Sequence, residues 1–332
     1  MNRLILTSSD SGAGGLIGAR LANCLIPFGL RFVWGQLPSR IELETLLSSR
    51  SARRDPSASH WLDLARKRLE EVQADGPGLI EFCRRFDAVE LWIDPDPNGQ
   101  LTLSWLLDYL RHHVQTASKL TLVQADVCIG NHAPEELAGW RLPAIKITND
   151  HLEAASMAWQ AYRQPTPQDW FNLLGEDLSV LPQLRQSVLE LLEELPMVAT
   201  GLGATEMRML ELISAGDAGP FDVFPGDKKP NKRRVFDFWE IGALLDGLAH
   251  CPAPAVSGLD EGPFTLEMHE DRNRHERYQR SKLELTAYGN AILAGAEDFS
   301  RHNPIHRWWG GTRLTNDCLW RWDPATRDLI AP

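Results

Sequence analysis

The chain has 332 residues, of which 43% are hydrophobic and 24% are charged, so it can bury a sizeable core and is not a disordered chain. Its length predicts about two domains, and its net charge of -11 argues against a general polyanion binder, which needs clustered Lys and Arg. No apolar run is long enough to span a membrane, and the N-terminal run is too short for a signal peptide. We therefore expect a cytoplasmic protein without a membrane partner.

The cysteines are few and far apart, and no pair has the Cys-x-x-Cys spacing of a structural zinc site. This distribution also argues against a disulfide framework. We expect reduced thiols in the core or in loops, and no metal site. The five residues are Cys24, Cys83, Cys128, Cys251 and Cys318.

The first elements in chain order read as a βαβ unit. Residues 4–7 form a short apolar run typical of a buried strand, and a glycine-rich turn follows it. Residues 13–26 have helical character, and residues 32–34 are a candidate second strand. A further helix is expected over residues 59–73, with its apolar side chains on one stripe.

The clearest local pattern lies between residues 88 and 124. Residues 88–93 predict a strand, which the prolines of the segment 94–99 cannot continue. From Gln100 the apolar spacing predicts a helix, and residues 119–124 predict another strand. Because strands alternate with helices, we expect residues 1–150 to form a Rossmann-like α/β domain with a parallel sheet.

The pattern then becomes helical, and the last third starts afresh. Residues 151–200 predict a helical connecting segment with helices at 151–163, 167–174 and 182–195. Residues 201–332 predict a winged-helix-like C-terminal domain. Its expected elements are helices at 204–214 and 234–249, a hairpin of strands at 264–267 and 282–285, and a helix at 287–294.

Several stretches of the sequence together form a distinctive pattern. They are residues 10–11, 91–96, 100–101, 158–163, 165–167, 195–202, 205–206, 307–311 and 320–323. These stretches resemble a bacterial family catalogued only as a domain of unknown function, family 1835, together with its usual C-terminal companion domain. Asp10-Ser11 stands where the family has a Gly-Asp-Ser turn, with Ser9 in place of the usual glycine. Pro95 replaces a customary histidine and Gly99 a customary acidic residue. The resemblance covers nearly the full length, and it implies an architecture but no activity.

The glycine-rich turn after the first strand is a candidate phosphate site. Backbone N–H groups at the start of a helix favour anions. The dinucleotide fingerprint is incomplete, since the third glycine, Gly18, comes one residue late and no acidic residue follows the candidate second strand. The alternative is that the glycines permit a tight turn and close helix packing. The ligand-binding candidates are Ser9, Asp10, Ser11, Gly12 and Gly14.

A second group follows the strand at 88–93 and consists of Asp94, Asp96 and Gln100. If the two strands are neighbours, these residues and Asp10 converge on one crevice at the carboxyl ends of the strands, where α/β proteins bind ligands. Such carboxylates could divide acid and base roles or hold Mg²⁺ and a phosphate. The alternative is that Asp94 and Asp96 end the strand and cap the next helix.

A third group is basic and precedes the helix predicted at 234–249. Its members are Lys228, Lys229, Lys232, Arg233 and Arg234. In a winged helix this position leads into a DNA-contacting helix, and the arginine-rich stretch 272–282 would correspond to a wing. Acidic residues interrupt both segments, so the alternative is a pair of solvated loops.

The sequence thus leaves three functions open and assigns neither a reaction, nor a cofactor, nor an oligomeric state. The first is binding of a phosphorylated small molecule or nucleotide at the strand ends, with Asp10, Asp94, Asp96 and Gln100 as candidate catalytic residues. The second is nucleic-acid binding through the basic group. The third is a non-catalytic interaction scaffold, supported by Pro95 in place of the family's histidine and by the absence of a complete catalytic set. Independently of these functions, we expect the Trp-rich stretches 307–311 and 320–323 to pack the chain end onto a domain.

Overall fold

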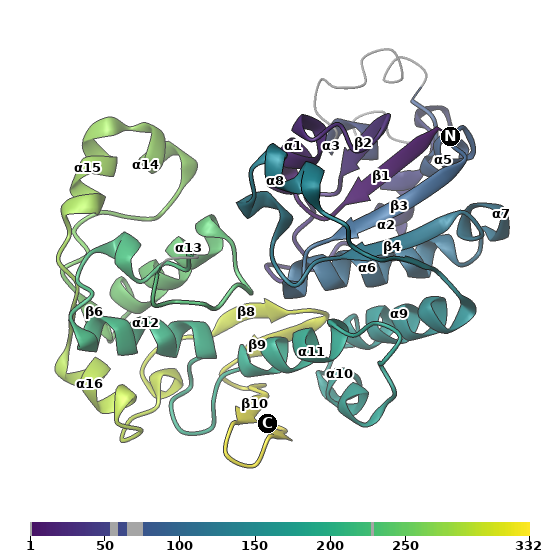
Figure 1. Cartoon of the computed structure of the whole chain (residues 1–332). Helices are drawn as coiled ribbons and strands as arrows, with labels where there is room; N and C mark the ends of the chain where they lie inside the picture. Colours follow the sequence, from purple (N-terminus) through teal and green to yellow (C-terminus); the bar gives the residue numbers. More distant parts are fainter. Residues whose placement is uncertain (1, 54–58, 65–75, 227–228) are drawn as a thin grey trace. The chain divides into compact units, whose positions relative to one another are not determined.

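The computed structural model describes residues 2–53, 59–64, 76–226 and 229–332 (Figure 1). The described chain forms two compact units that interleave in sequence. Unit 1 comprises residues 1–32, 36–163 and 173–187, and unit 2 comprises residues 33–35, 164–172 and 188–332.

Unit 1 is a mixed α/β unit built on one five-stranded sheet. The strand order is β2-β1-β3-β4-β5, and only β5 runs antiparallel to its neighbour. The parallel sheet predicted from the sequence is therefore present. The strands are β1 (Arg3–Thr7), β2 (Cys24–Pro27), β3 (Ala88–Ile93), β4 (Leu120–Gln124) and β5 (Ala144–Lys146).

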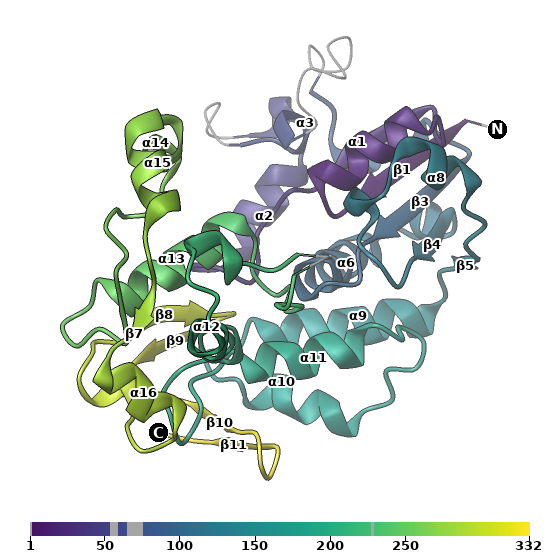
Figure 2. The same cartoon turned by 60° about the vertical axis from the view of Figure 1, so that its left-hand side comes forward.

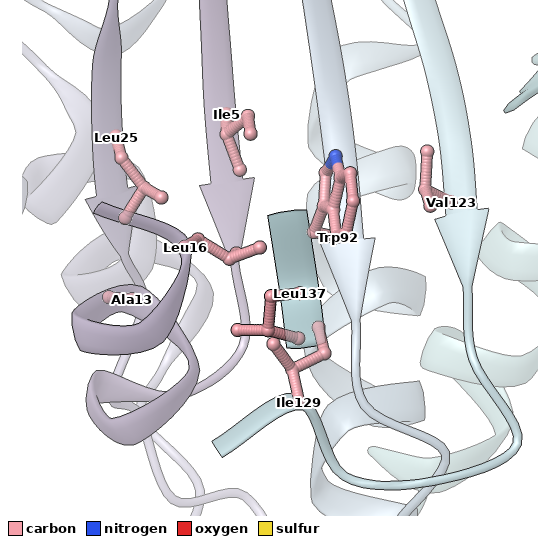
Figure 3. Close-up of a cluster of buried hydrophobic side chains, with 8 residues drawn as sticks. All are labelled: Ile5, Ala13, Leu16, Leu25, Trp92, Val123, Ile129 and Leu137. Atoms are coloured by element: carbon pink, nitrogen blue, oxygen red, sulfur yellow. The ribbon is translucent and has the colours of Figure 1, made fainter. Parts of the chain in front are cut away.

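Helices cover both faces of this sheet, which explains why the parallel strands are mainly apolar. Helices α1 (Asp10–Gly18) and α8 (Pro134–Gly139) lie on one face. Figure 3 shows the buried cluster beneath them, in which Leu16 of α1 and Leu137 of α8 meet Trp92 of β3. Helix α6 (Pro97–Leu110) packs beneath β3 and against α9 (Asn149–Tyr162) (Figure 1).

The beginning of the chain differs from the prediction in the position of the second strand. Helix α1 ends at Gly18, and the next strand is Cys24–Pro27 instead of residues 32–34. Leu25 and Ile26 are buried beside β1, whereas Trp34 is 39% exposed. A short apolar run fits a strand as well as a helix end, and pairing with β1 decides between them.

The remaining elements of unit 1 are short helices and turns. Of the helix predicted at 59–73, the structure describes Trp61–Leu64 as α3; residues 65–73 lie outside the described residues. The others are α2 (Arg40–Leu47), η1 (Arg50–Ala52), α5 (Leu79–Arg84), α7 (Val114–Ala117), η3 (Ile129–Asn131) and η4 (Leu173–Gly175). Helix α11 (Leu184–Glu193) begins in unit 1 and ends in unit 2.

Unit 2 consists of helices and three two-stranded sheets. Helices α12 (Ala204–Ala215), α13 (Phe238–Ala249) and α16 (Ala287–Leu293) lie close to their predicted ranges. The paired strands are β6 (Val256–Ser257) with β7 (Glu284–Leu285), β8 (His306–Trp309) with β9 (Thr312–Thr315), and β10 (Arg321–Asp323) with β11 (Asp328–Ile330). Helix α10 (Gln168–Asn172) and turns η5 (Pro220–Asp222) and η6 (Phe299–Arg301) complete the unit.

The predicted hairpin of strands 264–267 and 282–285 is wrong. Helices α14 (Leu266–Glu270) and α15 (Arg272–Arg280) occupy this region and lie side by side (Figure 2), and β7 pairs with β6. Thr265 caps α14 by accepting a hydrogen bond from the Met268 N–H at 3.3 Å. The cap and the run of helix-favouring charged residues from Arg272 outweigh the alternation at 264–267.

The Trp-rich end of the chain packs inside unit 2. Trp309 is 5% exposed and Trp322 is 2% exposed. The indole N–H of Trp309 donates to the Leu191 carbonyl at 2.7 Å, and its ring meets Trp170 edge-on. Across the described parts of both units, none of the helices is both long and apolar enough to cross a bilayer.

Candidate functional site

The two bends singled out in the sequence meet at one edge of the sheet in unit 1. Strands β1 and β3 are adjacent and parallel, with Thr7 opposite Trp92, so Ser9 and Asp94 follow their carboxyl ends. The Ser9 hydroxyl donates to the Asp94 carboxylate at 2.7 Å. The order β2-β1-β3-β4 places these residues where the chain changes direction across the sheet, which is the ligand-binding position in open α/β folds.

Asp94 ties together the ends of three strands. It is buried at 3% exposure, and its Oδ1 accepts from the Ile129 N–H at 2.7 Å. Its Oδ2 accepts from Ser9, and its own N–H donates to the Ser8 hydroxyl at 3.0 Å. A carboxylate bound by protein donors on both oxygens links the segments after β1, β3 and β4, which agrees with the strand-ending alternative for this residue.

Asp96 begins helix α6 and has an unusual acidity. Its Oδ1 accepts from the Gly99 N–H at 3.0 Å, as an N-cap residue does. Burial, with a smaller contribution from the charge of Asp94, raises the pKa of Asp96 to about 6. Arg31 lies near enough to oppose this shift. The predicted helix start at Gln100 moves to Pro97, because proline is favoured in the first turn after a cap.

Gln100, which is buried, belongs to a chain of hydrogen-bonded side-chain amides. Its Nε2 donates to the Asp94 carbonyl at 2.9 Å and to Gln183 at 3.2 Å, and its Oε1 accepts from Gln124. Gln183 in turn donates to the Ala125 carbonyl at 2.8 Å. These contacts hold the carboxyl ends of β3 and β4 together, so Gln100 orients the edge of the sheet.

The glycine-rich segment is mostly helix instead of loop. Gly12 and Gly14 lie inside α1, whose N-cap is Ser9. A Cβ at Gly18 would lie 2.7 Å from the Pro134 ring, so this glycine allows α8 to pack closely on α1. Gly14 is exposed, and a Cβ added to it would have no heavy atom within 4 Å. Close helix packing, the alternative for this segment, thus accounts for Gly18 but not for Gly14.

Two exposed side chains remain at this edge, Asp10 and Ser11 in the first turn of α1. Asp10 faces the segment after β2, since a Cβ at Gly29 would lie 3.5 Å from its carboxylate. Ser11 lies against Gly130 of η3, where a Cβ would lie 2.2 Å from the hydroxyl. We call these two residues of α1 and Asp96, which follows β3 at the same edge of the sheet, the switch-point site (Asp10, Ser11, Asp96).

The basic group predicted for nucleic acid is largely engaged within unit 2. Arg233 donates to Glu193 and Glu194 at 2.9 and 2.8 Å, and Lys229 Nζ donates to the Phe221 carbonyl. Lys232 and Arg234 also have interaction partners, and Lys228 lies outside the described residues. The predicted wing is helix α15, in which Arg274 and Arg277 both bind Glu261.

A cavity of about 290 Å³ in unit 1, between α2, α6 and α9, has no counterpart among the sequence predictions. The guanidinium group of Arg163 lies 5.3 Å from the Trp159 ring centre and donates to the Pro38 carbonyl at 3.0 Å. Arg40 and Arg111 also line the cavity, as do His112 and His113. In the sequence, the change from apolar to polar residues at the end of α6 could have indicated this cavity. The lining residues from α2 could not be predicted, because only tertiary packing brings α2 next to α6.

The fold therefore defines a mixed α/β protein whose mostly parallel sheet carries polar residues at its switch point. No family model matches the chain, and a comparison with curated proteins finds no match. Among the described residues no group of three or more His, Cys, Asp or Glu side chains is arranged to hold a metal ion.

Proposed function

We propose that unit 1 binds a phosphorylated small molecule or a nucleotide at the switch-point site. The observation that carries this proposal is the hydrogen bond from Ser9, the N-cap of α1, to Asp94, two residues before the α6 N-cap Asp96, where β1 and β3 end side by side. Both helices point their N-termini at this edge, and helix N-termini favour negative charge.

The roles follow from which groups the fold buries and which it exposes. Asp94 and Gln100 orient the edge through bonds to protein groups, whereas Asp10 and Ser11 are exposed there. With a pKa of about 6, Asp96 is partly protonated near neutral pH and can donate a hydrogen bond to a phosphate oxygen. Ionised Asp96 repels the same phosphate, so we expect binding to weaken as the pH rises through 6.

The test is thermal denaturation with a panel of nucleotides and sugar phosphates, with and without Mg²⁺. A ligand that binds only the folded state raises the melting temperature, because it adds about 2.7 kcal/mol of stability at a hundredfold excess over Kd. Asp96→Asn should make binding of a phosphate ligand independent of pH between 5 and 7, apart from the ligand's own titration. Glu153→Gln, an exposed position on α9, is the control. No shift with any phosphate compound overturns the proposal.

The Arg163 cavity is the competing location for the same ligand. Arg163→Gln removes its guanidinium group while leaving the switch-point residues unchanged. If a phosphate ligand stabilises the Asp96→Asn and wild-type proteins alike but not Arg163→Gln, the ligand binds between α2, α6 and α9, and the switch-point assignment is wrong.

The alternatives of a winged-helix nucleic-acid binder and of a non-catalytic scaffold have less support. Helices α12, α13 and α16 with the β6–β7 pair follow the order of a winged helix, but each of these strands has two residues and α14–α15 stand in place of a wing. A gel-shift titration at two salt concentrations distinguishes these alternatives, since phosphate contacts by Lys229 or Arg234 would weaken with salt.

A further inference from the structure

Unit 2 contains a small aromatic pocket that no part of the proposed phosphate function uses. Its volume is about 190 Å³. Trp34 and Phe236 meet edge-on in its wall with ring centres 5.7 Å apart, and Trp308, Trp309 and Leu314 also line it. The pocket is mainly apolar, and one cation, Arg307 on β8, belongs to its lining.

Arg307 has a hydrogen-bonding edge for which the described residues supply no acceptor. Its Nη1 donates to Glu206 at 3.0 Å. Its Nε and Nη2 are both buried, and among the described residues neither has a hydrogen-bond partner. These two nitrogens form one side of the planar guanidinium, the side that binds both oxygens of a carboxylate or phosphate. Burying such donors without partners lowers the stability of the folded state, and a ligand that supplies an acceptor would remove this cost.

Other arginines of the same unit show what normally occupies this edge. Nε and Nη2 of Arg233 both donate to Glu194 Oε1, at 3.1 and 2.8 Å. The same two nitrogens of Arg274 donate to Glu261 Oε1, and those of Arg277 donate to Glu261 Oε2. In each case a carboxylate accepts from the pair of nitrogens that, in Arg307, has no hydrogen-bond partner in the described part of the chain.

We propose that this pocket binds a small aromatic carboxylate, with the ring between the Trp34 and Trp308 walls and the carboxylate on Nε and Nη2 of Arg307. A volume near 190 Å³ fits one ring system and is below the size of drug-like sites. Glu194 lines the pocket, and Glu206 forms an ion pair with Arg307. Because these carboxylates repel a second negative charge, a singly charged carboxylate ligand is favoured over a doubly charged phosphate.

Binding requires a local movement, because the two nitrogens have almost no exposed surface. Trp34 is the most exposed of the aromatic walls, at 39%, and it precedes Gly35, whose φ of 72° lies in the left-handed region. We expect the Trp34 side chain to shift when the carboxylate enters. The tryptophan fluorescence of the chain, to which Trp34 contributes as one of twelve tryptophans, should therefore change on binding.

The experiment titrates the full chain with phenylacetate and follows tryptophan fluorescence and calorimetric heat. Two compounds with the same ring serve as comparison ligands: phenylacetamide, which is uncharged, and phenyl phosphate, which is doubly charged. Since a charge-assisted bidentate contact is lost, we expect phenylacetamide to bind at least about tenfold more weakly. Arg307→Lys keeps the charge beside Glu206 but lacks the two-donor edge, and it should weaken phenylacetate by a similar factor. Arg301→Lys, exposed on η6, should leave binding unchanged.

Three results overturn the proposal: no fluorescence change or heat at millimolar phenylacetate, equal binding of the acid and the amide, or equal binding by Arg307→Lys and the wild type. If Arg307 had only a structural role, Arg307→Lys would have a lower melting temperature than the wild type, and the wild type would not bind phenylacetate. If Arg307→Lys does not fold, Trp34→Ala and the acid–amide comparison on the wild type decide. Success or failure here is independent of the switch-point site, which lies in unit 1.

Discussion

Two aspartates at the end of β3 show how neighbouring residues of one type take different tasks. Asp94 accepts hydrogen bonds from Ser9 and Ile129 and so joins segments that follow three strands. Asp96 caps α6, and burial raises the pKa of its carboxyl by more than the hydrogen bond from the Gly99 N–H lowers it. The first residue stabilises the edge of the sheet, and the second carries the chemistry proposed for it.

Asp94→Ala is expected to destabilise unit 1 by about 3 kcal/mol, because it leaves the Ile129 N–H and the Ser9 hydroxyl without their charged acceptor. Asp94→Asn keeps a side-chain oxygen that accepts from the Ile129 N–H, and its amide N–H can donate to the Ser9 hydroxyl. The loss of stability should therefore be about half as large as for Asp94→Ala. Urea denaturation at pH 7 measures both values. Equal, small losses for the two variants would contradict the linking role of Asp94.

Asp96 makes the stability of the protein depend on pH in a direction opposite to that of a salt-bridged acid. Because its folded pKa is raised to about 6, from about 3.9 in the unfolded chain, its contribution is fully present below pH 4 and is lost as the pH rises through 6. Asp96→Asn keeps a capping side chain and removes this loss.

We therefore expect Asp96→Asn to be about 1–2 kcal/mol more stable than the wild type at pH 7 and equally stable at pH 4, since solvent reaches the partly exposed Asp96 carboxyl and offsets part of its desolvation. The difference in unfolding free energy between the two proteins, measured by urea denaturation from pH 4 to 7, isolates Asp96 from the other carboxylates. A difference that does not change with pH would show that Asp96 titrates normally.

At the scale of elements, α1 contains two glycines with different structural roles. Gly14 is exposed and surrounded by open space, whereas Gly18 lies so close to the Pro134 ring that a Cβ there would overlap it. The first is a helix residue with a poor helix propensity, and the second is a spacer between α1 and α8.

Gly14→Ala should stabilise unit 1 by about 0.5–1 kcal/mol through the higher helix propensity of alanine. Gly18→Ala should instead destabilise it, because the rigid Pro134 ring has to move. Thermal denaturation of the two variants is a matched comparison within one helix. If both changes stabilise the protein, α8 does not need the close approach that Gly18 permits.

At the scale of the whole molecule, the two units alternate along the sequence, so that each is built from several separate segments. Unit 2 includes residues 164–172, and from this segment Trp170 is fully buried and donates to the Val188 carbonyl at 3.2 Å. Its ring also meets Trp309 on β8. The division of the chain is thus not a single cut.

A fragment of residues 164–332 should consequently melt at a higher temperature than a fragment of residues 188–332, because the longer one contains Trp170 and the complete helix α11. Burial of a tryptophan of this kind contributes about 3–5 kcal/mol when tested by truncation to alanine. Circular dichroism melts of the two fragments compare them. Indistinguishable melting temperatures would mean that Trp170 is not part of the core of unit 2.

The sequence predicted those features that depend on local pattern. The strand at 88–93, the strand ending at Gln124 and the helices beginning at Ala204 and Ala287 follow from apolar spacing and capping residues. It also indicated the parallel sheet, whose strands present their carboxyl ends at the same edge, but the adjacency of the first and third predicted strands entered only as a condition for a shared site.

What local pattern could not fix is decided by contacts between distant segments. Pairing with β1 makes Cys24–Pro27 a strand, and pairing with β6 removes Glu284–Leu285 from the predicted hairpin. The state of each polar residue is set in the same way: the bonds of Asp94 to Ser9 and Ile129, the burial of Asp96, and the edge of Arg307 that lacks an acceptor among the described residues. Sequence spacing determines which side chains an element carries, but the partners and the solvent exposure of those side chains are properties of the packed chain alone.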